Sequence, residues 1–186
     1  MKKKPKKKKP PTKQQLIEKL RKKCVTRAKV LAKRRDGYKC LYCGVGKPQR
    51  MIHSHHFYHE GLNKHMSADV KNLVSLCATH HQGGKWMRSN SGFNFHNSPT
   101  EAKEWFDKTY PDVSERLKIR SQEKYTLDMS YWLEKEKELL ELEEMLDRGI
   151  EDEIENSLMA SFTPAENGDE VIENEVNKIL DETLTT

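Results

Sequence analysis

Two pairs of metal-binding side chains stand out in the first half of this chain. Cys40 pairs with Cys43, and Cys77 pairs with His80, each pair with two residues between its members. Zinc prefers four tetrahedral sulfur or nitrogen ligands, commonly supplied as two close pairs. Gly44 follows the first pair and permits the tight turn of a zinc knuckle. The spacing therefore predicts a structural zinc site rather than buried cysteines without metal.

A second set of residues, namely His55, His56, Asn72 and His81, is not needed for that zinc. Adjacent residues of a strand point to opposite faces, so His55 and His56 can serve one site only if the strand is twisted or bulged there. Adjacent residues of a helix diverge by about 100°, which lets His80 bind the zinc while His81 serves another site. We expect a second metal, with a water that it activates, beside the zinc.

The remaining candidates have less specific interpretations. An amide such as Asn72 can fix an imidazole's orientation or bind a hard metal through its oxygen. Four other histidines are expected to be polar surface residues or supports for the ligands, and not ligands themselves: His53, His59, His65 and His96. Cys24 falls on an apolar stripe and is expected in the core.

Periodicity and breakers predict the elements that must position these residues. Residues 13–35 have apolar residues at three- and four-residue steps, which predicts an amphipathic helix with a basic outer face. Residues 51–57 and 70–76 are expected to be short strands. A helix should begin at Cys77 and close at Gly83-Gly84.

Helices are also expected in the second half of the chain. One should run from residue 99 to about 110 and stop at Pro111, and another is expected over 113–124. A last helix ends at Gly149, and we expect it to pack back on the body rather than form a coiled-coil dimer, which would need more heptads. Its apolar face is formed by Trp132, Leu133, Leu139, Leu140, Leu142 and Leu146.

Composition indicates a small core with long charged extensions. The 186 residues are 34% hydrophobic and 34% charged, with no apolar run near the roughly 20 residues of a membrane span. The polar N-terminus does not resemble a secretory signal. We therefore expect an intracellular protein without a membrane partner, whose cysteines are not paired in disulfides.

Charge is distributed very unevenly along the chain. Residues 1–35 contain seventeen Lys or Arg and one Glu, whereas residues 151–186 contain eleven Asp or Glu and one Lys. The basic end suits a phosphate backbone. Residues 1–12 are predicted to be a flexible basic arm, although a nuclear import signal has similar composition. The acidic end is expected to be a disordered tail rather than a DNA-mimicking autoinhibitory segment.

The order of these motifs resembles the HNH endonuclease family over residues 35–84. The segments that carry the resemblance are Arg35 to Gly44, His55-His56-Phe57, Asn72 to Cys77, and His80-His81. It implies a ββα-metal fold, in which a hairpin carries the first His, a loop the Asn and a helix the last His. The chain would then be α+β: a small zinc-stapled ββα-metal core flanked by helices, with disordered tails.

The resemblance also implies roles for the second set. His56 would be the general base, His55 and His81 the ligands of one catalytic divalent metal, and Asn72 a residue that positions the base or assists metal binding. His55 stands where the family often has an Asp. A neutral imidazole there leaves Mg, Mn, Ni and Zn all open as the catalytic metal. The four zinc ligands depart from the family's usual pattern at one position, because His80 stands where Cys is usual.

A further resemblance, to the NinG/Rap recombination proteins of phages, extends beyond this core. It rests on the basic helix, the aromatic residues around 93–110 and the terminal Leu/Glu-rich helix. It implies nicking of branched DNA, such as Holliday junctions or D-loops, in the cytoplasm of a bacterial host. Symmetric cutting of a junction needs two active sites, which a homodimer would supply.

Phosphate contacts are expected from two basic groups near the predicted site. Lys33, Arg34 and Arg35 directly precede it, and Lys85 and Arg88 follow its helix. The predicted organisation is a basic arm, a basic helix, a nuclease core, a helical region and an acidic tail, over residues 1–12, 13–35, 36–98, 99–148 and 149–186.

Two other functions remain open on the sequence. A non-catalytic zinc-ribbon module that binds DNA would keep the four zinc ligands but would not need His56, Asn72 and His81. An HNH enzyme of the restriction or homing type would keep both sets. No separate target-recognition domain is evident.

Overall fold

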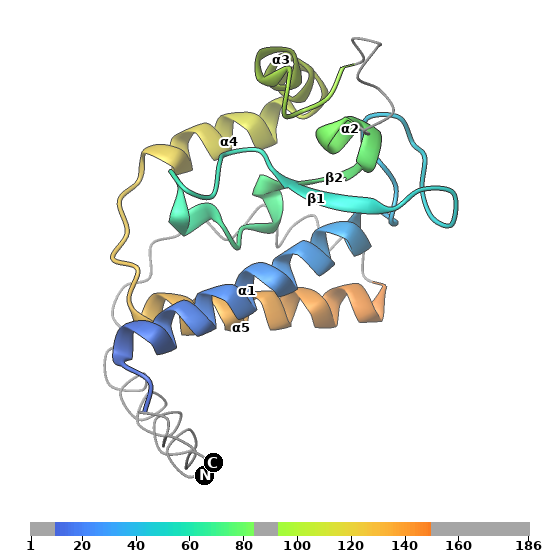
Figure 1. The fold of residues 1–186 in the computed structure, drawn as a ribbon. Helices are drawn as coiled ribbons and strands as arrows, with labels where there is room; N and C mark the ends of the chain where they lie inside the picture. Colours follow the sequence, from blue (N-terminus) through green and yellow to red (C-terminus); the bar gives the residue numbers. More distant parts are fainter. Residues whose placement is uncertain (1–9, 84–92, 150–186) are drawn as a thin grey trace, which may run out of the picture.

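The computed structural model describes residues 10–83 and 93–149, which fold in three layers (Figure 1). A two-stranded antiparallel sheet lies in the middle, with helices α1 and α5 on one side and helices α3 and α4 on the other. The described part is thus a mixed α+β structure, as predicted. The predictions for the basic arm and the acidic tail fall largely on residues 1–9 and 150–186, which lie outside the described residues.

Helix α1 (Lys13–Arg35) has the bounds that its periodicity predicts. Its N-terminus is closed by a capping box, in which Thr12 and Gln15 exchange two side-chain to backbone hydrogen bonds of 2.8 and 3.3 Å. The predicted apolar stripe faces the core, and Cys24 is only 1% exposed within it. The buried residues of the helix are Leu16, Ile17, Cys24, Val25, Ala28, Leu31 and Ala32.

Strands β1 (Ile52–His56) and β2 (Leu73–Cys77) pair in an unbroken antiparallel register, with His55 opposite Val74 and His56 opposite Leu73. The second strand begins three residues later than predicted, because residues 70–72 form a 3-10 turn. Every residue of β2 is buried. Leu73 packs in the core with α1 and α5, whereas Val74 and Leu76 pack in a second core with α3 and α4.

Three short helices follow the sheet. Helix α2 (Ala78–Gln82) ends at Gly83, whose φ of 70° favours glycine. Helix α3 (Pro99–Thr109) and helix α4 (Pro111–Gln122) are nearly continuous. Pro111 both stops α3, as predicted, and begins α4 at a position where its missing N–H costs nothing.

Helix α5 (Met129–Arg148) packs on α1 with the same chain direction. The thiol of Cys24 donates to the carbonyl oxygen of Trp132 at 3.5 Å, and Trp132 is 1% exposed. The predicted packing of this helix on the body is confirmed. The prediction of its apolar face was wrong at one residue, because Leu140 is 42% exposed. Within residues 10–83 and 93–149, none of the helices has the length and apolar character of a membrane span.

Two adjacent leucines of α5 test this packing. Leu139→Ala should lower the free energy of unfolding by about 2–5 kcal/mol, because a side chain only 3% exposed leaves a cavity. Leu140→Ala, with the same chemistry at the exposed position, should cost less than about 1 kcal/mol. Urea denaturation of both variants measures the difference, and equal losses would show that α5 buries another face.

Candidate metal centre and imidazole cavity

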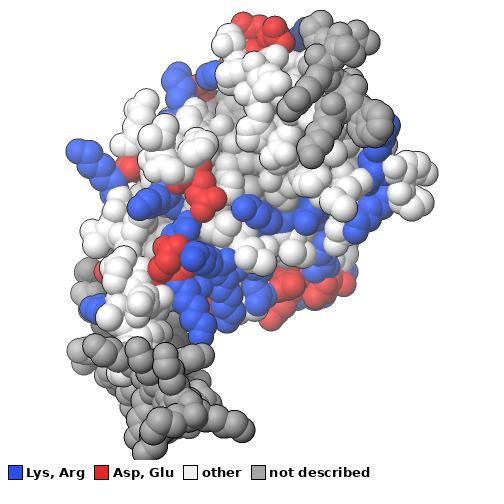
Figure 2. Space-filling view, in the orientation of Figure 1, with Lys and Arg blue, Asp and Glu red and all other residues white. Residues whose placement is uncertain are grey.

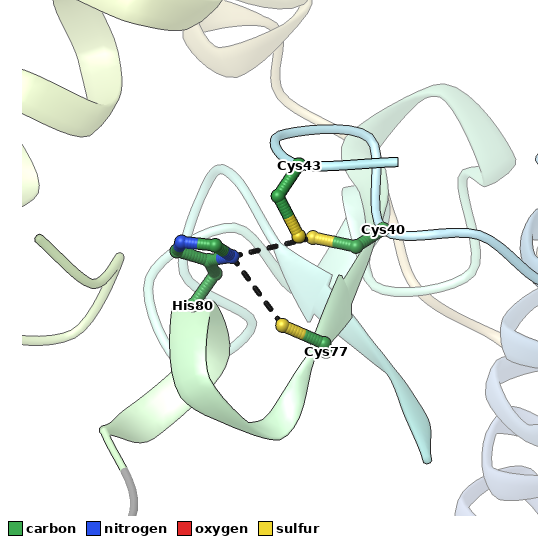
Figure 3. Close-up of side chains that lie close together, drawn as sticks. All are labelled: Cys40, Cys43, Cys77 and His80. Carbon is green, nitrogen blue, oxygen red and sulfur yellow. Dashed lines mark hydrogen bonds between the residues drawn. The ribbon is translucent and has the colours of Figure 1, made fainter. Parts of the chain in front are cut away.

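The first site is the predicted set of three cysteines and one histidine (Figure 3). Cys40 and Cys43 come from the turn after α1, Cys77 ends β2, and His80 lies on α2. The Nδ1 atom of His80 lies 3.3 Å from the sulfur of Cys77 and 3.6 Å from that of Cys40. All four ligand atoms lie within 4.8 Å of one another.

This geometry fits a tetrahedral zinc. Bond lengths of about 2.0–2.1 Å to nitrogen and about 2.3 Å to sulfur place neighbouring ligand atoms roughly 3.5–4 Å apart. The turn that presents the first pair is held by backbone hydrogen bonds from Cys40 to Val45 and from Gly44 to Cys40, of 2.9 and 2.8 Å. Gly44 has a φ of 72°, as the predicted knuckle requires. The four residues can therefore hold a structural zinc.

Burial and hydrogen bonding act in opposite directions on two of these thiols. Burial raises the pKa of Cys40 to about 11. Burial also acts to raise the pKa of Cys77, but the backbone N–H groups of His80 and Thr79 and the other thiols of the cluster lower it below its ordinary value. Cys77 thus gives up its proton more readily than Cys40, and a thiol must lose its proton to bind zinc.

The second site is a cluster of three imidazoles from three elements. His55 lies on β1, His81 on α2 and His96 in the segment before α3. Their candidate ligand atoms also lie within 4.8 Å of one another. The ring centroids are 5.4 Å apart for His55 and His81, 5.1 Å for His55 and His96, and 4.9 Å for His81 and His96.

His96 is the residue that sequence reasoning missed, since it was expected to be a surface or supporting residue. It shares no spacing with the other ligands, and residues 84–92 between it and α2 lie outside the described residues. The backbone brings it back to the cluster through a hydrogen bond of 2.9 Å from the Phe95 N–H to the carbonyl oxygen of His80. The ring of His53, which was also expected to be a surface or supporting residue, stacks on His81 with the ring centroids 5.3 Å apart.

Two of these rings are kept neutral by their surroundings. Burial, aided by the nearby rings of His81 and His96, lowers the pKa of His55 to about 3. Burial is the main cause that lowers the pKa of His81 to about 4, and the nearby rings of His96 and His53 lower it further. A neutral imidazole has a lone pair to offer, so these two rings can act as metal ligands at pH 7.

His56 lies on the opposite face of β1 and is held by one clear hydrogen bond. Its Nε2 lies 2.8 Å from the carbonyl oxygen of Ser67. A carbonyl can only accept, so Nε2 carries the proton and Nδ1 carries the lone pair. Glu60 approaches that Nδ1 to 3.8 Å, which is too long for a hydrogen bond. Burial lowers the pKa of His56, so this ring also favours the neutral form.

His56 and the imidazole cluster open into one cavity of about 550 Å³ that wraps around β1. The pairing of β1 with β2 is unbroken there, so no bulge unites the two faces. Instead β1 is an edge strand, and the cavity reaches both of its faces. Cationic side chains join the histidines in the lining: Arg21, Lys29 and Lys64.

Asn72 is fully buried and does not line this cavity. Its side-chain oxygen accepts from the Tyr58 N–H at 2.7 Å, and its amide nitrogen donates to the carbonyl oxygens of Tyr58 and Met66 at 3.0 and 3.1 Å. These bonds pin the loop that follows His56. Of the two roles predicted for Asn72, the geometry therefore favours positioning over metal binding.

Two of the residues predicted to contact phosphate already bind other groups of the protein. Arg35 donates to the carbonyl oxygens of Val70 and Leu73 at 2.8 and 2.9 Å and pairs with Asp36 at 2.7 Å. Its guanidinium therefore ties α1 to β2 instead of facing solvent. Arg34 pairs with Asp147 of α5 at 2.5 Å.

Lys33 is only partly exposed. Lys85 and Arg88 lie outside the described residues.

A search of protein-family models, of curated proteins and of solved structures finds no match to this chain.

Removal of one cysteine tests the zinc site. Purified protein should contain about one zinc per chain, and Cys77→Ser should lose it, because three ligands hold zinc far more weakly than four. Cys24→Ala removes a buried cysteine outside the cluster and should keep the metal. Elemental analysis after dialysis against a mild chelator measures both, and loss of zinc from the Cys24 variant would contradict the assignment.

Proposed function

We propose that this chain is a metal-dependent endonuclease that hydrolyses phosphodiester bonds in DNA. One observation carries the proposal: a cluster of three imidazoles and a separately oriented imidazole, His56, open into one cavity lined by both cationic and acidic side chains. A zinc-stapled scaffold alone would need neither. The order β1, β2, α2, with His55 and His56 on the first strand and His81 on the helix, also agrees with the ββα-metal fold of HNH endonucleases.

His56 suits the role of general base. Its proton is fixed on Nε2 by Ser67, which leaves the Nδ1 lone pair to take a proton from water. The imidazolium formed in that step carries a positive charge, and the carboxylate of Glu60 lies close enough to stabilise it. Arg21 holds Glu60 in place at 2.6 Å. Asn72 supports this arrangement by fixing the loop between His56 and Ser67.

His55, His81 and His96 suit a single divalent ion. When bound, such an ion supplies positive charge that stabilises the phosphorane and the departing 3′-oxygen. The three ligands come from β1, α2 and the segment before α3, so they would hold the ion on one side while a phosphate approaches from the cavity. Attack by the water that His56 deprotonates leaves 5′-phosphate and 3′-hydroxyl ends.

Branched DNA, such as a four-way junction, is the substrate that we propose within this class. The support is the resemblance to phage recombination proteins in sequence, together with α5, which packs on the basic helix α1 and leaves cationic residues exposed on it (Figure 2). A labelled junction, a linear duplex and a single strand should be incubated with Mg, Mn, Ni or EDTA. Cutting of the junction alone supports the proposal, whereas equal cutting of all three substrates indicates a general nuclease. No cutting of any substrate favours the non-catalytic zinc-ribbon module instead.

His56→Ala should lower the cleavage rate by about 10²–10⁴-fold, because the base is lost while the metal ligands remain. Affinity for the junction, measured by fluorescence anisotropy without added divalent ion, should hardly change. His59→Ala, at an exposed histidine of the same cavity, is the control and should keep the rate. A His56 variant that still cuts at the wild-type rate would refute its role.

His96→Ala tests the metal cluster without relying on activity. Titration calorimetry with Ni or Mn should show the second metal bound at least about 10–100-fold more weakly. Mutation of a residue that only supports a metal ligand already lowers metal affinity by that factor. The zinc content should stay at one, because the four zinc ligands are untouched. His59→Ala again serves as the control. Unchanged affinity in the His96 variant would mean that His96 is not a ligand.

A further inference from the structure

We infer that Lys29 of α1 is a further catalytic residue, whose ammonium group binds a non-bridging oxygen of the scissile phosphate between His56 and the imidazole cluster. The inference rests on the proposed hydrolysis of a phosphodiester and names a group that would hold the reacting phosphate. Lys29 lines the imidazole cavity together with two other cations, Arg21 and Lys64. The three differ in what already binds them and in which rings they lie near.

The backbone of Lys29 is fixed against β1. The hydroxyl group of Ser54 donates to the carbonyl oxygen of Lys29 at 2.9 Å. Ser54 and His56 are two residues apart on the strand, so their side chains lie on the same face of β1, the face that α1 covers. Lys29 therefore starts from the side of the strand that carries His56, and its half-buried side chain lines the cavity that reaches both faces.

The charge of Lys29 reaches rings on both faces of β1. Burial is the main cause that lowers the pKa of His56, and the charge of Lys29 lowers it further. Burial is also the main cause that lowers the pKa of His81, and Lys29 acts there in the same direction, after the rings of His96 and His53. Of the cations that line the cavity, Lys29 is thus the one that lies near both the proposed base and the imidazole cluster.

The charge of Lys29 is also available to a ligand. Arg21 pairs with Glu18 at 2.9 Å and with Glu60 at 2.6 Å, so its charge is largely used inside the protein. Glu60 lies near enough to interact with Lys29, but its carboxylate pairs with Arg21 instead. Within residues 10–83 and 93–149, no carboxylate forms an ion pair with Lys29. An anionic oxygen in the cavity would give this half-buried ammonium group the partner that such charges usually have.

A cation at this position stabilises the transition state more than the substrate. A phosphodiester carries one negative charge, and attack by hydroxide adds a second charge to the phosphorus oxygens. Lys29 donates hydrogen bonds to these oxygens and keeps its own proton. His56 takes the proton of the attacking water, the bond from phosphorus to the 3′-oxygen breaks, and that oxygen takes a proton from solvent. An interaction that strengthens during this step raises kcat rather than lowering KM.

Lys29→Met tests this role, because methionine is also an unbranched side chain but carries no charge. The kcat for DNA cleavage should fall by about 10²–10³-fold, the usual effect of removing one donor to a developing oxyanion, whereas KM should change much less. Lys29→Arg restores the charge and should recover most of kcat. Lys108→Met, at an exposed lysine of α3 outside the cavity, is the control and should keep both constants.

A second measurement does not depend on cleavage. A thymidine dinucleotide and its neutral methylphosphonate analogue are titrated into the zinc-loaded protein without added divalent ion, and the ring signals of His56 and His81 are followed by NMR. The wild-type protein should bind the anionic dinucleotide more tightly than the neutral one. Lys29→Met should reduce this preference by about 10–100-fold, because a hydrogen bond to a charged group is lost. Lys29→Arg and Lys108→Met should keep the preference.

The outcomes separate this inference from the proposed function. An unchanged kcat in Lys29→Met, a loss that appears only in KM, or an unchanged preference for the anionic dinucleotide would overturn the catalytic role of Lys29. The zinc content of each variant checks that it is folded. If the wild-type protein cuts no DNA, the proposed function is wrong, and the dinucleotide preference alone then decides whether Lys29 binds a phosphodiester.

Discussion

The link between Cys77, His80 and the cysteine turn is the constraint on which the rest of the site depends. Helix α2 has five residues and none of them is buried, so neither its length nor a core contact would keep it in place. The side chain of His80 ties it to the three cysteines, and Tyr42 and Phe95 contact the same residue. Because His81 is the next residue, the same anchor sets the position of His81 against His55. The cysteine and histidine cluster thereby fixes the geometry of the imidazole cluster.

A second consequence of this anchor concerns His96. The carbonyl oxygen of His80 accepts the Phe95 N–H, so the segment that carries His96 is registered on α2 rather than on the sheet. The ring of Phe95 is buried against Trp105 of α3, which fixes the segment from the other side. His81 and His96 are therefore positioned by the cysteine and histidine cluster and the aromatic core beside it, whereas His55 is placed by the pairing of β1 with β2.

The sequence predicted what is local and missed what is not. The stripe of α1, the zinc pairs and the capping glycines of α2 and α5 are set by spacings of a few residues, and each appears where it was expected. His96 lies far from its partners in sequence and has no periodic signal, so only the tertiary fold reveals it. Leu140 was misjudged for a related reason, and the inward turn of Arg35 was not foreseen. Whether a leucine at the edge of a stripe is covered, or an arginine turns inward to backbone carbonyls, depends on which neighbour packs there.

A divalent ion held by the three imidazoles would keep its full charge, whereas carboxylate ligands would neutralise it. Burial is what keeps His55 and His81 neutral. Arg21, Lys29 and Lys64 add three positive charges to the lining, against two from Glu18 and Glu60. A loaded cavity of this kind would attract a phosphodiester more strongly than a carboxylate site would. The same ligand set favours ions that accept nitrogen, such as zinc or nickel, over magnesium, which prefers oxygen.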